Sequence, residues 1–268
     1  MGRRVVQELQ QASHSVAVFD LAPPDAADVA HVAGDILSLA QLEAAFAVQQ
    51  AVVHLAALPD PSTFAAERLF EVNVMGTFNV LEAAARAGIK KVVMASTDST
   101  MGFMYGEHGR QPIYLPINEE HPLQTADQYG LGKMIGEEIC RSYTRRHGMT
   151  TVCLRLTLVW EPDRGADLVW IIDKARERAH GLWAYVDSRD AARVFRLALE
   201  SDMTGHATMF IAAADSLARE PLVDLVAEFY PHVETRAKVD EIRALISHAK
   251  ANRLLGYTPL HSWRQSLY

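Results

Sequence analysis

Tyr129 and Lys133, in the segment YGLGK, have a spacing that could support acid–base chemistry. Residues four apart lie on the same face of an α-helix, so the lysine ammonium can stand close to the phenol. A nearby cation favours the phenolate and lowers the tyrosine pKa from about 10, which makes the side chain a usable base near neutral pH. The spacing also fits a packed tyrosine beside a solvated lysine, so the motif alone leaves both interpretations open.

Small polar residues lie upstream of this pair. Ser96, Thr97, Asp98 and Ser99 follow the apolar segment KKVVMA without a break. If that segment is a parallel strand, they lie at its carboxyl end, where ligands bind in open α/β sheets. A hydroxyl there could hold a substrate oxygen while Tyr129 takes its proton. Such residues also cap turns, which is the alternative interpretation of this run.

Asp20 ends another apolar run, SVAVFD. A carboxylate at a strand end can accept hydrogen bonds from an adenosine ribose and repel a 2′-phosphate. The residues that follow, LAPPDAADV, contain no basic side chain, which favours NAD over NADP. An acidic residue at a strand end is also common turn chemistry.

The segments that position these residues alternate between strand-like and helix-like patterns. Short apolar runs predict strands, and apolar residues at helical spacing predict helices. The predicted strands are 15–20, 51–57, 90–97 and 150–156, and the predicted helices are 39–47, 66–88 and 127–148. Strands that are apolar on both sides and separated by helices predict a doubly wound, parallel α/β sheet.

The regular alternation loosens after about residue 160. Helices are predicted over 168–181, 219–231 and 247–257, a short strand feeding a helix over 183–201, and a strand over 207–214. We expect residues 1–160, with 183–214 returning to the sheet, to form a cofactor-binding domain. Residues 161–182 and 215–268 are expected to form a small substrate-binding lobe at the carboxyl edge of the sheet.

Composition argues against several classes of function. The chain has 26 Lys and Arg against 33 Asp and Glu, a net charge of -7, which is not the balance of a nucleic-acid binder. Cys140 and Cys153 form no CxxC pair, as expected of free thiols in a reducing compartment. No apolar run approaches about 18 residues, and the histidines show no metal-ligand spacing. We expect a cytoplasmic protein that binds neither membrane nor metal.

The motifs resemble one family when they are taken in chain order. The matching segments are VFD (18–20), GDI (34–36), HLAA (54–57), EVNVMGTFNVLEAA (71–84), KKVVMASTDSTMG (90–102), YGLGK (129–133), LRLTLVWEP (154–162) and WAYVDSRDAAR (183–193). Together they resemble the NAD-dependent epimerase/dehydratase family of extended short-chain dehydrogenase/reductases. The resemblance covers nearly the whole chain. It implies a Rossmann-like fold, NAD as cofactor, and a homodimer formed through helices 66–88 and 127–147.

The resemblance also implies a role for each matching residue. Tyr129 is the implied acid/base, Lys133 lowers its pKa and holds the nicotinamide ribose, and Thr97 binds the reacting oxygen. The further implied cofactor contacts are Gly2, Asp20, Asp35, Ile36, Leu55, Ala56, Ala57, Asn73 and Leu156. The implied substrate contacts are Asp98, Ser99, Thr157 and Arg164.

Departures from the family pattern narrow the range of reactions and substrates that we expect. Ser99 stands where the dehydratases have a glutamate, and a serine hydroxyl is a poor base for water elimination. Leu158 and Glu161 replace the asparagine and glycine of nucleotide-sugar enzymes. The short segment that follows is similar to the uronate dehydrogenase branch, in which Arg164 could meet a sugar carboxylate. The cations of this segment are Arg164, Lys174, Arg176 and Arg178, and a solvated helix face would explain the last three equally well.

We therefore expect an NAD-dependent oxidoreductase or epimerase that acts on a hydroxyl of a sugar or sugar acid by Tyr–Lys-assisted hydride transfer. The alternatives are a nucleotide-sugar 4-epimerase, and a non-catalytic dinucleotide-binding relative with an impaired cofactor site.

The resemblance also bears on the first residues. Gly2 matches the last glycine of the family's glycine-rich turn, and RRVVQELQQASH matches the helix that faces the pyrophosphate. The family's first, central strand and its two earlier glycines have no counterpart here. We expect a fragment or a misassigned start, or else a truncated protein with weakened NAD affinity.

Overall fold

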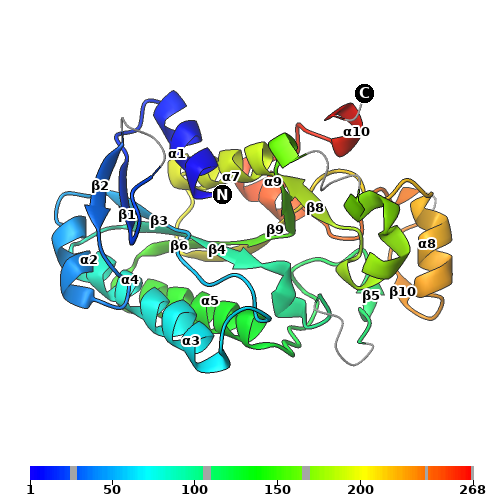
Figure 1. The fold of residues 1–268 in the computed structure, drawn as a ribbon, viewed down its shortest axis with the longest axis horizontal. Coiled ribbons are helices and arrows are strands. Elements are labelled where there is room, and N and C mark those ends of the chain that lie inside the picture. Colours follow the sequence, from blue (N-terminus) through cyan, green and yellow to red (C-terminus); the bar gives the residue numbers. More distant parts are fainter. Residues whose placement is uncertain (25–28, 105–109, 165–169, 239–240, 267–268) are drawn as a thin grey trace.

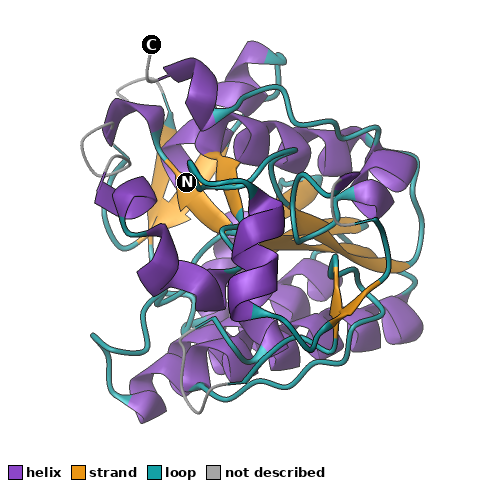
Figure 2. Cartoon of the chain, turned by 90° about the vertical axis from the view of Figure 1, so that its right-hand side faces the viewer, coloured by secondary structure: helices purple, strands orange, loops and turns teal. Residues whose placement is uncertain are grey.

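Parallel strands lie at the centre of the molecule and helices cover both of their faces (Figures 1 and 2). The computed structural model describes residues 1–24, 29–104, 110–164, 170–238 and 241–266. This arrangement confirms the predicted doubly wound, parallel α/β fold.

The main sheet has the strand order β3-β4-β6-β9, and all of its pairs are parallel. A second, two-stranded sheet, β1-β2, is also parallel. The strands of these two sheets are β1 (Ala17–Asp20), β2 (Ala30–Ala33), β3 (Ala51–His54), β4 (Lys91–Thr97), β6 (Thr150–Leu156) and β9 (His206–Ile211).

Two further pairs of short parallel strands, β7-β8 and β5-β10, lie toward the other end of the molecule. Their bounds are β5 (Tyr114–Leu115), β7 (Leu158–Trp160), β8 (Tyr185–Asp187) and β10 (Glu234–Thr235).

Helices connect the strands and close the chain. The α-helices are α1 (Gly2–Gln11), α2 (Leu39–Phe46), α3 (Ala66–Phe70), α4 (Gly76–Arg86), α5 (Gln128–His147), α7 (Ser188–Glu200), α8 (Leu222–Phe229), α9 (Ala249–Leu255) and α10 (Trp263–Ser266). Tighter or wider helical turns are η1 (Glu71–Met75, a π-helix) and the 3-10 turns η2 (Asp98–Met101), η4 (Pro162–Arg164) and η5 (Ala175–Gly181).

Side chains that alternate along the strands enter two separate cores. Val93 of β4 packs in the core that α1 and α7 cover, whereas its neighbours Val92 and Met94 pack in the core that α2, α4 and α5 cover. Because successive residues of a strand point to opposite faces, a strand buried on both faces must be apolar throughout. This requirement explains why β4 and β6 were predicted within one residue of their observed bounds.

A third core belongs to the lobe that β5, η5, α8 and β10 form, at the right of Figure 1. Met101 and Phe103 pack in this core together with Trp183 and Phe210. The lobe is therefore joined to the carboxyl edge of the sheet, where η2 directly follows β4.

Two predicted helices differ from the structure. The segment 66–88 contains the π-helical turn η1 between α3 and α4, and the last part of segment 168–181 is the 3-10 turn η5. The predicted strand 51–57 ends at His54, and residues 55–57 continue as a loop. Within the described part of the chain, no helix has the length and apolar character needed to cross a bilayer.

Candidate active site

Helix α5 places Tyr129 and Lys133 on one face, as their spacing predicts. The carboxylate of Asp127 accepts a hydrogen bond from Gly130 N at 2.7 Å and so caps the helix just before Tyr129. Lys133 Nζ lies 5.9 Å from the centre of the Tyr129 ring and donates a hydrogen bond to Ala95 O at 2.9 Å. The ammonium is therefore anchored to β4 beneath the tyrosine.

Lys133 is only 6% exposed. Its burial lowers the pKa of the ammonium to about 8, because desolvation penalises the charged form. The group still carries its charge at neutral pH. A cation held in a poorly solvated position interacts strongly with a phenolate, so this pair can stabilise the deprotonated form of Tyr129.

Thr97, Asp98 and Ser99 lie at the carboxyl end of β4 and form a buried cluster of hydrogen bonds. Thr97 Oγ1 accepts from Ser99 N at 3.1 Å and lies 3.2 Å from Asp98 Oδ1, to which it can donate. The first turn of α5 packs against this cluster at Gly130, the residue after Tyr129, where a Cβ atom would stand 2.6 Å from Ser99 O. Only glycine allows the first turn of α5 to approach the cluster this closely.

Burial raises the pKa of Asp98 to about 7, because desolvation disfavours its carboxylate. Between its ordinary pKa of 3.8 and this value, the folded protein binds a proton that the unfolded chain releases. The free energy of unfolding therefore falls as pH rises through this interval, and Asp98 contributes no further change above it.

Replacing Asp98 with asparagine should remove this pH dependence. We expect the stability of the wild type relative to Asp98→Asn to decline from about pH 4 to about pH 7 and then to stay level. Urea unfolding of both proteins across this pH range measures the difference. A difference that is independent of pH would show that Asp98 ionises normally in the folded state.

A buried ion pair between Glu137 of α5 and Arg155 of β6, which the sequence did not predict, links the two elements next to the site. The Glu137 carboxylate accepts hydrogen bonds from Arg155 Nε at 2.9 Å and Nη2 at 2.7 Å, and from Ser96 Oγ at 2.6 Å. All three side chains are buried. The spacing of Lys133 and Glu137, again four residues, was the signal available in the sequence, but it does not reveal the partner on β6.

Asn73 clamps the loop after β3. Its side chain accepts a hydrogen bond from Leu58 N at 2.8 Å and donates one to Leu58 O at 3.0 Å. Next to it, His54 is hydrogen-bonded to Thr77 Oγ1 at 3.0 Å, and burial lowers the pKa of His54 to about 3, so the ring is neutral. The predicted cofactor contacts Leu55, Ala56 and Ala57 lie in the loop that Asn73 fixes.

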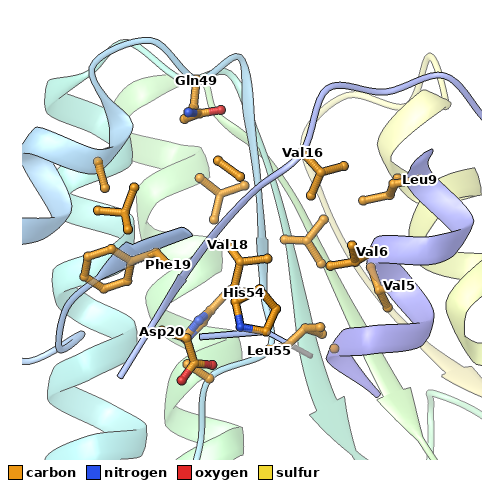
Figure 3. Close-up of a pocket in the computed structure, with 18 of the residues that line it drawn as sticks. Val5, Val6, Leu9, Val16, Val18, Phe19, Asp20, Gln49, His54 and Leu55 are labelled. Atoms are coloured by element: carbon orange, nitrogen blue, oxygen red, sulfur yellow. The ribbon is translucent and has the colours of Figure 1, made fainter. Parts of the chain in front are cut away.

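The remaining predicted cofactor contacts lie at the amino end of α1 (Gly2), at the carboxyl end of β1 (Asp20), just after β2 (Asp35 and Ile36) and at the end of β6 (Leu156). Figure 3 shows Asp20 and Leu55 at the same end of a cavity, and Gly2 also lines it. Asp35 Oδ1 accepts from Leu37 N at 2.9 Å, whereas the Ile36 side chain is buried against the backbone of Gly76. Leu156 is the buried last residue of β6.

These residues fit NAD by their chemistry. The amino end of α1 has no side-chain cap, so its first N–H groups and positive dipole end are suited to a pyrophosphate. The exposed Asp20 carboxylate can accept hydrogen bonds from ribose hydroxyls, and Lys133 can donate to a second ribose. Within the described part of the chain, no cluster of side chains could hold a metal ion.

The predicted substrate contacts are placed differently from one another. Asp98 and Ser99 belong to the cluster at the end of β4. Thr157 is buried, and its hydroxyl donates to Ile211 O at 3.1 Å, so it ties β6 to β9. Arg164 ends the turn η4, but its side chain lies outside the described part of the structure.

Comparison with known proteins identifies the family. The model of the NAD-dependent epimerase/dehydratase family matches residues 1–212. The chain belongs to this family. NAD is therefore its cofactor, and the sheet that carries the site is a Rossmann-like sheet of the extended short-chain dehydrogenase/reductase type.

Individual relatives are more distant. The chain is 29% identical over 60% of its length to an L-arabinose 1-dehydrogenase (NAD(P)(+)) of Haloferax volcanii, and 26% identical over 78% to a uronate dehydrogenase of Pseudomonas syringae pv. tomato. These matches span 65% and 70% of the two relatives. The chain is also 40% identical, over 34% of its length, to a putative UDP-glucose 4-epimerase of Methanocaldococcus jannaschii. That match spans only 27% of the relative.

A solved structure shows the same fold over nearly the whole chain. It is a short-chain dehydrogenase/reductase superfamily protein of Agrobacterium tumefaciens with bound NAD. The TM-score is 0.75 at 23% identity, with 99% of this chain and 91% of that chain covered.

Proposed function

We propose that this protein is an NAD-dependent dehydrogenase that oxidises a hydroxyl group of a sugar acid. The observation that supports the proposal is the packing of the first turn of α5 against the backbone of Ser99, with Lys133 Nζ 5.9 Å from the centre of the Tyr129 ring, at the carboxyl edge of a parallel sheet. Bound NAD would supply the hydride acceptor for the oxidation of the substrate carbon. The chain itself must bind the reacting oxygen and remove its proton.

Each group has a distinct task in this proposal. Thr97 holds the reacting hydroxyl oxygen, and Tyr129 takes the hydroxyl proton as the hydride leaves. Lys133 keeps its charge near the phenol and so favours the phenolate that serves as the base. The Lys133 bond to Ala95 O fixes the ammonium, because a charge that drifts toward solvent would stabilise the phenolate less.

The cations near the lobe support a substrate with a carboxylate. Lys174 and Arg176 are held in surface ion pairs with Glu177 and Glu228. Among the described residues, no ion pair involves Arg178, which is partly buried in η5. A half-buried guanidinium with no ion-pair partner among the described residues is suited to bind a carboxylate in two-point fashion, so we propose Arg178, in addition to Arg164, as a substrate contact.

A panel of substrates tests the function. We expect NADH to form with a free uronate, such as galacturonate, faster than with the matching aldose, and little to form with UDP-glucose. Tightly held NAD without net reduction, together with interconversion of a nucleotide sugar, would support an epimerase instead. Absence of NAD binding in calorimetry would leave a non-catalytic relative and refute the proposal.

Replacing Arg178 with methionine should weaken uronate binding selectively. We expect KM for the uronate to rise by about tenfold or more, because a charge-assisted hydrogen bond is worth about 1.5–3 kcal/mol. KM for the corresponding aldose should stay unchanged. Arg176→Met, which removes an exposed cation from the same turn, is the matched control. An equal rise for acid and aldose would contradict a carboxylate contact.

We also propose that the protein forms a homodimer through α3, α4 and α5. Phe70, Met75 and Phe78, all within the continuous helical segment 66–86, are 44%, 48% and 39% exposed, and exposed large apolar side chains that gather on one face mark interaction surfaces. Light scattering should give twice the chain mass of 29.7 kDa. Met75→Asp should shift the protein toward monomer, whereas Val48→Asp, at an exposed apolar residue elsewhere, should not.

A further inference from the structure

Helix α5 packs against β4 and β6, and two side chains of one helix face attach it to β4 (Figure 1). Lys133 Nζ donates a hydrogen bond to Ala95 O at 2.9 Å, and Ser96 Oγ donates one to Glu137 Oε1 at 2.6 Å. Lys133 and Glu137 are four residues apart, so they lie on the same face of the helix. Because their partners are consecutive residues of one strand, the Glu137 contact fixes the register at which Lys133 meets β4.

The Glu137 carboxylate is held from a second strand as well. Arg155 of β6, which lies opposite Ser96, donates to Glu137 Oε1 from Nε at 2.9 Å and to Oε2 from Nη2 at 2.7 Å. Such a two-point contact fixes the orientation of a carboxylate as well as its position. Glu137 is only 2% exposed, so little water competes for these bonds. Two strands therefore hold this carboxylate on the helix face that carries Lys133.

Stability alone does not account for this ion pair. Apolar side chains of similar volume often stabilise a core as well as a buried ion pair does, because both charges of the pair lose their hydration. Among the described residues, Arg155 Nη1 is buried without a hydrogen-bond partner, so the pair also leaves one donor unsatisfied. The two charges are better explained by what they do to the neighbouring Lys133.

Glu137 is the acidic group that faces the Lys133 ammonium. The other titratable groups around this ammonium come from α5, β3 and β6, and they are Tyr129, Cys140, His54 and Cys153. Burial lowers the pKa of His54 to about 3, so the ring is neutral. A hydrogen bond with Cys140, together with burial, raises the pKa of the Cys153 thiol, which is neutral too. Among the described residues that face Lys133, Glu137 is the one carboxylate.

The charge of Lys133 is finely balanced. Burial lowers its pKa to about 8, and the negative charge of Glu137 acts in the opposite direction. An ammonium whose pKa is so close to neutral pH loses its proton readily when a neighbouring charge changes. Without that proton, Lys133 no longer favours the phenolate of Tyr129. The carboxylate of Glu137 is therefore placed to keep the ammonium in its working form.

We propose that Glu137 is a positioning residue for the reaction: held by Ser96 and Arg155, it sets the place of the Lys133 ammonium on β4 and keeps that group charged. The inference rests on the proposed function, in which Lys133 serves the base Tyr129. Glu137 acts through Lys133, and Arg155 and Ser96 act through Glu137.

The titration of Lys133 in the folded protein, without substrate, tests this role. NMR of protein made with isotope-labelled lysine follows the ammonium, and the signal that is absent from Lys133→Met identifies it. Glu137→Gln keeps the size of the side chain and removes its charge. We expect the midpoint of the Lys133 titration to fall by about 1–3 pH units, the range for loss of one nearby opposite charge.

The next residue of α5 provides the matched control. Glu138→Gln changes a side chain that is 53% exposed and should leave the Lys133 midpoint unchanged. If Glu137→Gln does not fold because Arg155 stays buried without a partner, Arg155→Met combined with Glu137→Gln replaces it, since this protein buries no unpaired charge. Its midpoint should fall too. An unchanged midpoint in the folded variant that lacks the Glu137 charge, or an equal change in Glu138→Gln, overturns the proposal.

Kinetics separate this role from a structural one. The rate should decline at alkaline pH as Lys133 loses its proton, so the alkaline limb of kcat should move to lower pH in Glu137→Gln, together with the Lys133 midpoint. KM for the uronate should stay within about twofold of the wild type. A lower kcat with the alkaline limb in its original place would indicate a structural role and overturn the proposal. If the wild type forms no NADH with any sugar acid, the proposed function fails, while the Lys133 midpoint still decides the role of Glu137.

Discussion

Replacing Tyr129 with phenylalanine is expected to lower kcat by about 10²–10⁴-fold, the usual contribution of a positioned acid or base. The change removes only the phenol oxygen and keeps the ring that lies 5.9 Å from Lys133 Nζ. Stability and NAD affinity should therefore stay close to those of the wild type. Steady-state rates with the best uronate, together with calorimetric NAD binding, measure both expectations.

A matched control for this variant lies on the same helix. Tyr143 donates a hydrogen bond to Glu82 at 2.7 Å and stacks on His147, two helical turns or more from Lys133. Tyr143→Phe should leave kcat unchanged, although it removes the same atom from the same kind of residue. A fully active Tyr129→Phe enzyme would refute the assignment of the base, whatever the control shows.

Replacing Arg155 with methionine is expected to destabilise the folded protein by about 3–5 kcal/mol, because it leaves the Glu137 carboxylate buried without its cation. The pair is almost fully enclosed, with side-chain exposures of 5% and 3%. Chemical denaturation measures the loss. Adding Glu137→Gln to the Arg155→Met variant should recover a large part of the lost stability, because the variant then buries no uncompensated charge.

The exposed pair of Arg141 and Glu138, also on α5, provides the control for this second change. These side chains are 47% and 53% exposed. Arg141→Met should cost less than about 1 kcal/mol, the typical contribution of a surface ion pair. Equal effects of Arg155→Met and Arg141→Met would mean that water reaches Glu137 in the folded state.

The sequence predicted the framework of the site because its strands obey a simple rule. β4 and β6 are buried on both faces, so their apolar runs mark their bounds, and the polar residues after β4 mark the carboxyl edge. The spacing of Tyr129 and Lys133 then indicated which helix carries the pair. These inferences use only neighbours in the chain or the regular period of one element.

Interactions between distant segments escaped prediction. Glu137 and Arg155 lie on different elements, and neither residue stands in a pattern that points to the other. The 3-10 geometry of η5 is equally hidden, since 3-10 and α-helices share similar apolar spacing over one or two turns. The family resemblance alone predicted that β1 and β3 would have no strand between them. The structure shows in addition that apolar side chains of α1 and α2 line the space between these strands.

The π-helical turn η1 has a consequence for insertions and deletions. A π-helical turn holds one residue more than an α-helical turn, so removing one residue from 71–75 would restore a continuous α-helix through α3 and α4. Each residue of an α-helix turns the chain by about 100°, and the shortened helix could no longer aim Asn73 at both backbone groups of Leu58. A single-codon deletion here would thus preserve the helix and release the loop after β3.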